Sequence, residues 1–180
     1  MYDIRLKRFV LIAFIVLLSA CAALPPSLQT NADPVVTDYS AWQASDDQGG
    51  RTVRLGGVVA SVRNMATKTR IEVVNLPINS LGQPDLYAEP SGRFIAYVRG
   101  FVDPVMMAKG RLVTFLGTSE KPEVGKVGYY TYHFPVMEAS GYHLWRVASV
   151  VTGYDPFLSP CFGERCGYHH RIKYNQVVLE

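Results

Sequence analysis

Basic residues are few and scattered in this sequence once its first eight positions are set aside. No later run of lysine or arginine, and no basic stripe, is present to follow a phosphate backbone. The formal charge of +3 becomes +1 without residues 1–20, since that segment holds three positive charges (Arg5, Lys7 and Arg8) and one negative charge (Asp3). We therefore expect no nucleic-acid partner.

Motifs that carry catalysis are also missing. There is no Gly-x-Ser-x-Gly elbow, and the glycine pairs at 49–50 and 56–57 lack the Lys-Ser/Thr of a phosphate-binding loop. His133 and His143 could each serve as a general base, but no nucleophile and orienting group accompany them. A solvated or hydrogen-bonded histidine is the simpler interpretation. We expect a protein that is not an enzyme, with no catalytic residue, no metal and no cofactor.

The longest apolar run is too short to cross a bilayer as a helix. Residues 9–18 are wholly apolar, which is ten residues against the roughly twenty that a span requires. Basic residues precede this run, and small residues follow it at positions 19–23. This order is typical of an export signal.

The junction Leu18-Ser19-Ala20-Cys21 resembles the lipobox of bacterial lipoproteins. The resemblance implies that the signal peptide 1–20 is removed, that Cys21 carries diacylglycerol, and that its new amino group is acylated, for example with palmitate. Three acyl chains would anchor a protein stably. Residue 22 is alanine and not aspartate, which for this class implies the outer membrane, on its periplasmic face or its surface. An ordinary secretory signal with an incidental cysteine is the alternative.

The other two cysteines, Cys161 and Cys166, lie five positions apart near the C-terminus. In an oxidising compartment such a pair favours a disulfide that closes a short loop. A metal site with His169 and His170 is the alternative, although adjacent side chains in an extended chain point in opposite directions. A redox-active pair is a further alternative, for which C-x-x-C is the usual spacing.

Between the lipobox and the folded part, residues 21–50 are rich in proline, glycine and aspartate and show no long apolar period. Such a segment is typical of an extended tether between lipid and domain. Isolated aromatic residues in a linker, here Tyr39 and Trp42, can dock on the domain that follows.

Short β-branched runs separated by glycine and proline fill residues 51–153. They predict five strands, over residues 53–63, 67–76, 92–102, 111–117 and 129–151, the last with a turn near 139–141. The apolar phase changes at Gly56-Gly57, which predicts a bulge there. Asp103, Pro104 and Gly110 have the positions that begin and end a short helix.

Three strands, a short helix and two further strands follow each other as in an OB-type barrel. The predicted fold class is therefore all-β and mostly antiparallel, a small OB-like barrel over residues 51–153, with a tail over 154–180. Another small barrel or a sandwich is the alternative architecture.

Several segments resemble the Slp family of outer-membrane lipoproteins. Besides the lipobox they are residues 53–60, 69–74, 92–96, 101–104, 109–114 and 142–145. The resemblance covers about residues 50–155 and implies an outer-membrane lipoprotein linked to starvation or stationary phase, with no established enzymatic activity. The tail beyond Tyr154 matches nothing in the family.

Four residues are candidates for a ligand-binding face. Arg70, Glu72, Tyr97 and Arg99 should point away from the core on the second and third strands, where OB barrels bind their ligands. The tyrosines that alternate near residues 129–132 could fill the core or lie outside it, where they would contact a partner. The function we expect is a stress-related envelope role through another envelope component. The alternative is a binding module for a glycan or a peptide.

Overall fold

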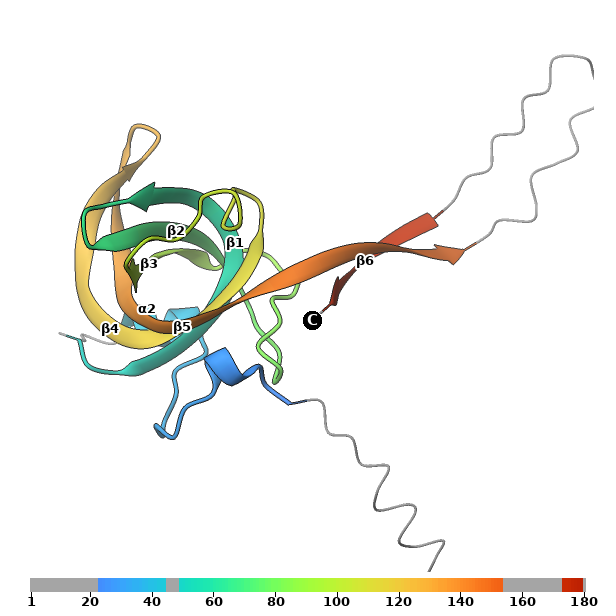
Figure 1. Ribbon diagram of the computed structural model, residues 1–180, viewed down its shortest axis with the longest axis horizontal. Helices are drawn as coiled ribbons and strands as arrows, with labels where there is room; N and C mark the ends of the chain where they lie inside the picture. The colour runs from blue at the N-terminus through green and yellow to red at the C-terminus, as the bar shows by residue number, and fades with distance from the viewer. Residues whose placement is uncertain (1–22, 45–48, 154–172, 180) are drawn as a thin grey trace, which may run out of the picture.

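The computed structural model describes residues 23–44, 49–153 and 173–179 (Figure 1). Its elements, in chain order, are the 3-10 helix η1 (Pro26–Leu28), the helix α2 (Tyr39–Ala44), and the strands β1 (Thr52–Asn64), β2 (Lys68–Leu76), β3 (Gly92–Arg99), β4 (Leu112–Val127), β5 (Tyr130–Gly153) and β6 (Lys173–Leu179). Among the described residues, none forms a helix of the length and apolarity needed to span a membrane.

Five strands form a closed ring (Figure 1). β1 pairs antiparallel with β2 and with β4, β2 pairs with β3, and β4 pairs with β5. A parallel pairing of β3 with β5 closes the ring. This order is that of an OB-type barrel, so the predicted all-β, mostly antiparallel class is confirmed.

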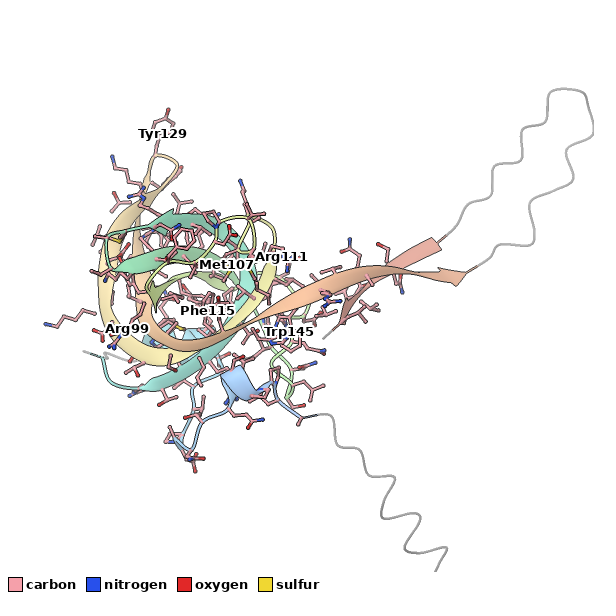
Figure 2. All side chains as sticks on the ribbon, viewed as in Figure 1. Arg99, Met107, Arg111, Phe115, Tyr129 and Trp145 are labelled. Atoms are coloured by element: carbon pink, nitrogen blue, oxygen red, sulfur yellow. The ribbon has the colours of Figure 1, made fainter. Side chains whose placement is uncertain are left out.

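The core fills the ring with side chains that alternate along its strands. Phe94 packs edge-on against Phe115, and Trp42 of α2 packs edge-on against Phe94. Tyr39 and Met107 are buried in the same cluster (Figure 2). Tyr39 and Trp42 thus dock on the domain, as their aromatic character suggested.

The N-terminal segment lies on the ring instead of forming an extended spacer. Val36 bridges to Val53 of β1, and the Arg54 guanidinium donates to the carbonyl of Leu28. Leu28 is fully buried in a second apolar cluster outside the ring, together with Leu76, Leu112, Leu116 and Trp145. Because Leu28 packs on leucines of β2 and β4 at the outside of the ring, residues 24–44 have a fixed place that composition alone did not indicate.

The predicted bulge at Gly56-Gly57 is wrong. Both glycines pair in register with β2, and the register changes further on, between Val59 and Ser61. The two glycines have a different role, since a side chain on Gly57 would collide with the backbone of β2. They allow close approach of two strands.

The predicted helix over residues 103–110 is also wrong, and the short helix of the structure is α2. The carboxylate of Asp103 accepts from the amide of Val105, as a helix start would require, but only turns follow. The amide of Gly110 donates to the carbonyl of Val59, whose own amide donates to the carbonyl of Arg111. The chain therefore pairs with β1 at residues 110–111, after a single turn, and a helix cannot extend further.

β4 and β5 form a hairpin much longer than the sequence predicted. β4 continues to Val127 where we expected an end at Gly117. β5 has no turn at residues 139–141, where only its register with β4 shifts, and a second shift follows between Glu120 and Glu123 of β4. The hairpin crosses the outside of β3, where Ile95, Phe134 and Val136 form a third buried cluster. The hairpin thus covers part of the outer face of β3.

The far end of β5 leaves the ring and pairs antiparallel with β6 as a two-stranded ribbon (Figure 1). The sequence did not predict β6. The predicted disulfide of Cys161 and Cys166, and the lipid site at Cys21, lie outside the described residues.

Candidate functional site

The four residues predicted to form a ligand face all lie on the outer side of β2 and β3. Arg70 stands directly opposite Tyr97, and Lys68 directly opposite Arg99. Their neighbours Ile71 and Ala96 belong to the core. Alternation along two paired strands therefore places the four on one surface, and their role in binding stays a prediction.

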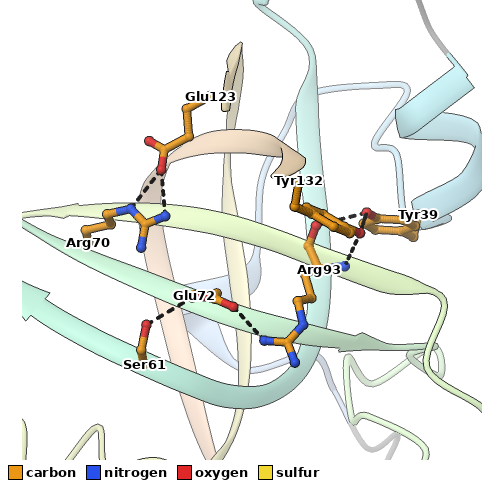
Figure 3. A network of polar contacts seen from close by, with 7 residues as sticks. All are labelled: Tyr39, Ser61, Arg70, Glu72, Arg93, Glu123 and Tyr132. Atoms are coloured by element: carbon orange, nitrogen blue, oxygen red, sulfur yellow. Dashed lines mark hydrogen bonds and ion pairs between the residues drawn. The ribbon is translucent and has the colours of Figure 1, made fainter. Parts of the chain in front are cut away.

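Glu123 of the hairpin joins two of these residues, Arg70 and Tyr97, and Figure 3 shows its contact with Arg70. Arg70 donates through Nε and Nη2 to Oε1 of Glu123, at 2.8 and 2.6 Å. The hydroxyl of Tyr97 donates to the other oxygen, Oε2, at 2.6 Å. Burial, and secondly the bond to Glu123, raises the pKa of Tyr97 above its ordinary value. One carboxylate thus fastens the hairpin onto β2 and β3.

The remaining two predicted residues each have an ion-pair partner. Glu72 pairs with Arg93 at 2.6 Å (Figure 3), and Arg99 pairs with Glu138 of β5 at 2.7 Å. The first pair is mostly buried, whereas the side chain of Arg99 is 86% exposed. Arg99 is therefore the predicted residue that is most accessible to a ligand.

A polar groove of 440 Å³ runs between this face and the hairpin. It is lined by Lys68, Tyr97, Arg99, Glu120, Lys121, Glu123, Val136 and Glu138. Three of these side chains are basic and three are acidic, and the ammonium of Lys68 lies 3.6 Å from the centre of the Tyr97 ring. Such a lining suits a ligand that carries both charges, and offers no excess of positive charge for a polyanion.

The structure brings Tyr97 and Arg99 together in the groove and links Arg70 to it through Glu123. Glu72 lies outside the groove lining. Sequence reasoning missed the groove residues Glu120, Lys121 and Glu123, because the fourth strand was predicted to end at Gly117 whereas β4 continues to Val127. The signal that could have found them is the run Val127-Gly128-Tyr129-Tyr130, in which glycine opens a two-residue hairpin turn.

The tip of the hairpin presents aromatic side chains to solvent. Gly128 has a φ of +62°, which fits the first central position of a type II′ turn, and Val127 pairs with Tyr130 across it. Tyr129 is fully exposed and Tyr130 is 82% exposed. Figure 2 shows Tyr129 at the outermost point of the hairpin. These tyrosines lie outside the core and can contact a partner.

The two histidines weighed as bases lie apart from this site. His133 is exposed and faces Val124 across the hairpin, whereas His143 lies against Trp145 with ring centres 4.3 Å apart. In the part of the chain that the structure describes, no group of three or more histidine, cysteine or acidic side chains could hold a metal ion.

A glutamine at position 123 is expected to loosen the hairpin. Glu123→Gln removes the charge that accepts from Arg70 and Tyr97, and should lower the free energy of unfolding by about 1–2 kcal/mol, near the low end for charged hydrogen bonds since the pair is partly exposed. Urea unfolding measures this change. Glu120→Gln, at an exposed groove position, should change stability by less than about 0.5 kcal/mol, and equal effects of both variants would contradict the assigned role.

Alkaline pH is expected to unfold the protein through Tyr39. Its hydroxyl donates to the carbonyl of Arg93 and contacts the hydroxyl of Tyr132 at 3.3 Å (Figure 3). Burial, and secondly the Tyr132 contact, raises the pKa of Tyr39 well above its ordinary value of about 10. The contribution of the Tyr39 hydroxyl to the free energy of unfolding is therefore fully present below a pH of about 10. It is lost as the pH rises toward the folded-state pKa, because Tyr39 ionises at lower pH in the unfolded chain.

Tyr39→Phe should consequently shift the alkaline unfolding midpoint to higher pH, read from tryptophan fluorescence between pH 8 and 12. The raised pKa of Tyr97 leaves some alkaline sensitivity in that variant. Tyr129→Phe, at a fully exposed position, is the matched control and should leave the midpoint where it is. A Tyr39→Phe midpoint equal to that of the wild type would contradict the argument.

Comparison with known proteins gives consistent matches. A sequence model described as the outer membrane lipoprotein Slp family matches residues 18–172, so the prediction that the family match ends at Tyr154 is wrong. Two proteins of Escherichia coli K12 are similar over 150 residues: an uncharacterized lipoprotein named YeaY, at 33% identity (83% of this chain, 77% of the relative), and outer membrane protein Slp, at 32% (81% and 78%). An uncharacterized protein of Haemophilus influenzae is 38% identical over 106 residues (58% and 56%). No solved structure matches the chain.

Proposed function

The chain belongs to the Slp family of outer membrane lipoproteins, and from this membership we propose that it binds another envelope component through the tip of its β4–β5 hairpin. The proposal includes a lipid anchor on Cys21, made of diacylglycerol and an N-acyl chain, and a role that involves no catalysis. It also places this role in the response of the envelope to starvation, as the family resemblance implies.

The observation that carries the proposal is the exposed aromatic tip. Tyr129 is fully exposed, Tyr130 is largely exposed, and Val124 on the same hairpin is also exposed. Tyrosine contributes large contact areas to protein interfaces at a small cost in side-chain entropy. In Figure 1 the tip points away from the place where the described chain begins, near the proposed lipid site. The tip is therefore accessible to a partner that lies away from the membrane surface to which the lipid would attach the chain.

Photocrosslinking from the tip tests this function. A benzoyl-phenylalanine at position 129 should give a discrete adduct in intact envelopes, and Tyr130→Ser should remove most of it. The same probe at Phe101, which is comparably exposed on the β3–β4 loop, is the control and should not give that adduct. Equal adducts from both positions would show that exposure alone causes the reaction, and would refute the assignment.

The polar groove supports the alternative, a module for a glycan or a peptide. Its balanced charges and its accessible arginine suit a peptide with free amino and carboxylate groups. Titration with soluble peptide–glycan fragments of the cell wall tests this alternative. Arg99→Ala should weaken binding at least about tenfold, since a charged hydrogen bond would be lost, and unchanged affinity would exclude the groove.

The starvation role has its own test. A strain that lacks the protein should lose viability in stationary phase when the envelope is challenged with detergent, and the intact gene should restore it. A gene that encodes Tyr129→Ser/Tyr130→Ser should fail to restore viability although the protein accumulates normally. Full restoration by this variant would separate the stress role from the hairpin tip.

A further inference from the structure

The link between the proposed lipid site and the folded domain is very short. Leu24 packs on the apolar cluster around Trp145, and its carbonyl accepts from the side chain of Gln29 at 2.7 Å. Only Ala22 and Ala23 separate it from Cys21. Three residues of extended chain reach about 10–11 Å at most. A lipid on Cys21 would therefore hold Leu24, and the surface around it, at the bilayer.

The surface around Leu24 is built from two further elements. Leu86, of the loop between β2 and β3, and Val178, of β6, pack on the same cluster as Leu24. The hydroxyl of Tyr87 donates to the carbonyl of Gln176 at 3.0 Å, which joins this loop to the ribbon. Figure 1 shows the ribbon leaving the ring on the side of the N-terminal segment. The three elements thus form one continuous surface.

Apolar side chains are exposed on this surface. Tyr87 is 73% exposed, Leu179 46% and Val177 37%. Val177 and Leu179 lie two positions apart and so share one side of β6, while Val178 between them faces the cluster. We call Leu24, Tyr87, Val177 and Leu179 the anchor face; Val147 pairs with Val178 and so lies on the other side of the ribbon.

The pairing of β5 with β6 adds a cation to the apolar residues. Ala148 stands opposite Val177, and the exposed Arg146 stands opposite Leu179. Directly paired residues point to the same side of a ribbon. Aliphatic side chains next to an arginine, with a tyrosine nearby, suit the boundary between acyl chains and anionic headgroups.

We propose that the anchor face rests on the lipid bilayer, with Val177 and Leu179 in the headgroup region. The domain is then docked on the membrane surface in a fixed orientation instead of hanging from a flexible tether, and the hairpin tip points away from that surface. This inference rests on the proposed lipid at Cys21. It also assigns a role to the ribbon, which the ring does not need for closure.

Fluorescence quenching by brominated lipids tests the orientation. The full-length lipoprotein is reconstituted in vesicles of phosphatidylethanolamine and phosphatidylglycerol with brominated acyl chains, as Val177→Trp and as Val124→Trp. Position 124 is the matched control, an exposed strand valine on the hairpin. The native Trp42 and Trp145 are buried and should contribute little quenching. We expect at least twofold quenching of Val177→Trp and almost none of Val124→Trp.

The outcomes separate this inference from the proposed anchor. Intact mass of the same preparation shows whether three acyl chains are present; an unacylated chain would refute the anchor, and the inference with it. An acylated protein with no quenching at position 177, or with equal quenching at both positions, would overturn the orientation and leave the anchor standing. An acylated protein that is unquenched at 177 and dimeric in sedimentation would assign the ribbon to a second copy instead.

Hydrogen exchange on the unmodified lipoprotein checks the result without any substitution. Amides of β6 and of residues 85–88 should exchange at least threefold more slowly in vesicles than in detergent micelles, whereas amides of residues 124–130 should not change. Equal protection of both regions would overturn the proposed orientation.

Discussion

Replacing Gly57 with alanine is expected to destabilise the folded chain by at least about 3 kcal/mol, beyond the usual range for added methyl groups in a core. The new Cβ would lie 1.9 Å from the carbonyl oxygen of Val74 and 2.8 Å from its carbonyl carbon. Both atoms are backbone of β2 and cannot rotate away. Relief requires β1 and β2 to separate near the end of β2, where Gly57 stands opposite Asn75.

A matched glycine in β4 gives the control for this prediction. At Gly125 the nearest atom to an added Cβ belongs to the ring of Phe134, at 3.0 Å, so a side chain and not the backbone has to adjust. Gly125→Ala should cost about 1 kcal/mol or less. Urea unfolding of both variants, followed by circular dichroism, measures the difference. Equal stabilities would show that the two strands are not held as closely at Gly57 as the structure indicates.

Gly56-Gly57 also shows how far pattern reasoning reaches. The paired glycines correctly marked an unusual place in the first strand. The pattern does not distinguish a bulge from a close approach, because that depends on the strand that pairs with it, and this partner is distant in sequence. The register change occurs instead after Val59, whose amide donates to the carbonyl of Arg111 and whose carbonyl accepts from the amide of Gly110, just before β4.

The candidate site was predictable where it depends on strand alternation. Arg70, Glu72, Tyr97 and Arg99 lie on one face because alternation along β2 and β3 is a local property of the sequence. Their partners were not predictable in the same way. Glu123 comes from a hairpin that crosses β3, and it lies in the part of β4 beyond Gly117, where no strand was predicted.

The same limit explains the N-terminal segment. Proline, glycine and aspartate make residues 21–50 look like a spacer, and local composition contains no sign of the surface on which they pack. The burial of Leu24 and Leu28 could be predicted only by knowing that Leu112 and Trp145 lie on the outside of the ring. This packing changes the functional interpretation, since a docked segment fixes the distance and the orientation between a lipid at Cys21 and the domain.

Trp145 fastens that segment to the ring, and Trp145→Ala is expected to cost about 3–5 kcal/mol, the range for buried aromatic truncations. The side chain is 1% exposed and packs among Leu28, Leu76 and Leu112. Its indole nitrogen donates to the hydroxyl of Thr114 at 2.9 Å, and that hydroxyl donates to the carbonyl of Gly82. The loss would therefore release both the N-terminal segment and the loop between β2 and β3.

Trp145→Phe separates packing from hydrogen bonding, since it keeps most of the apolar volume and removes only the indole donor. It should cost about 1–2 kcal/mol, because Thr114 retains its bond to Gly82. Urea unfolding measures both losses, and chymotrypsin digestion under native conditions reports on the segment. Cleavage after Leu28 should accelerate strongly in Trp145→Ala and weakly in Trp145→Phe. If neither variant accelerates this cleavage, Trp145 is not what holds the segment on the ring, and the contacts made by α2, Arg54 and Val53 suffice.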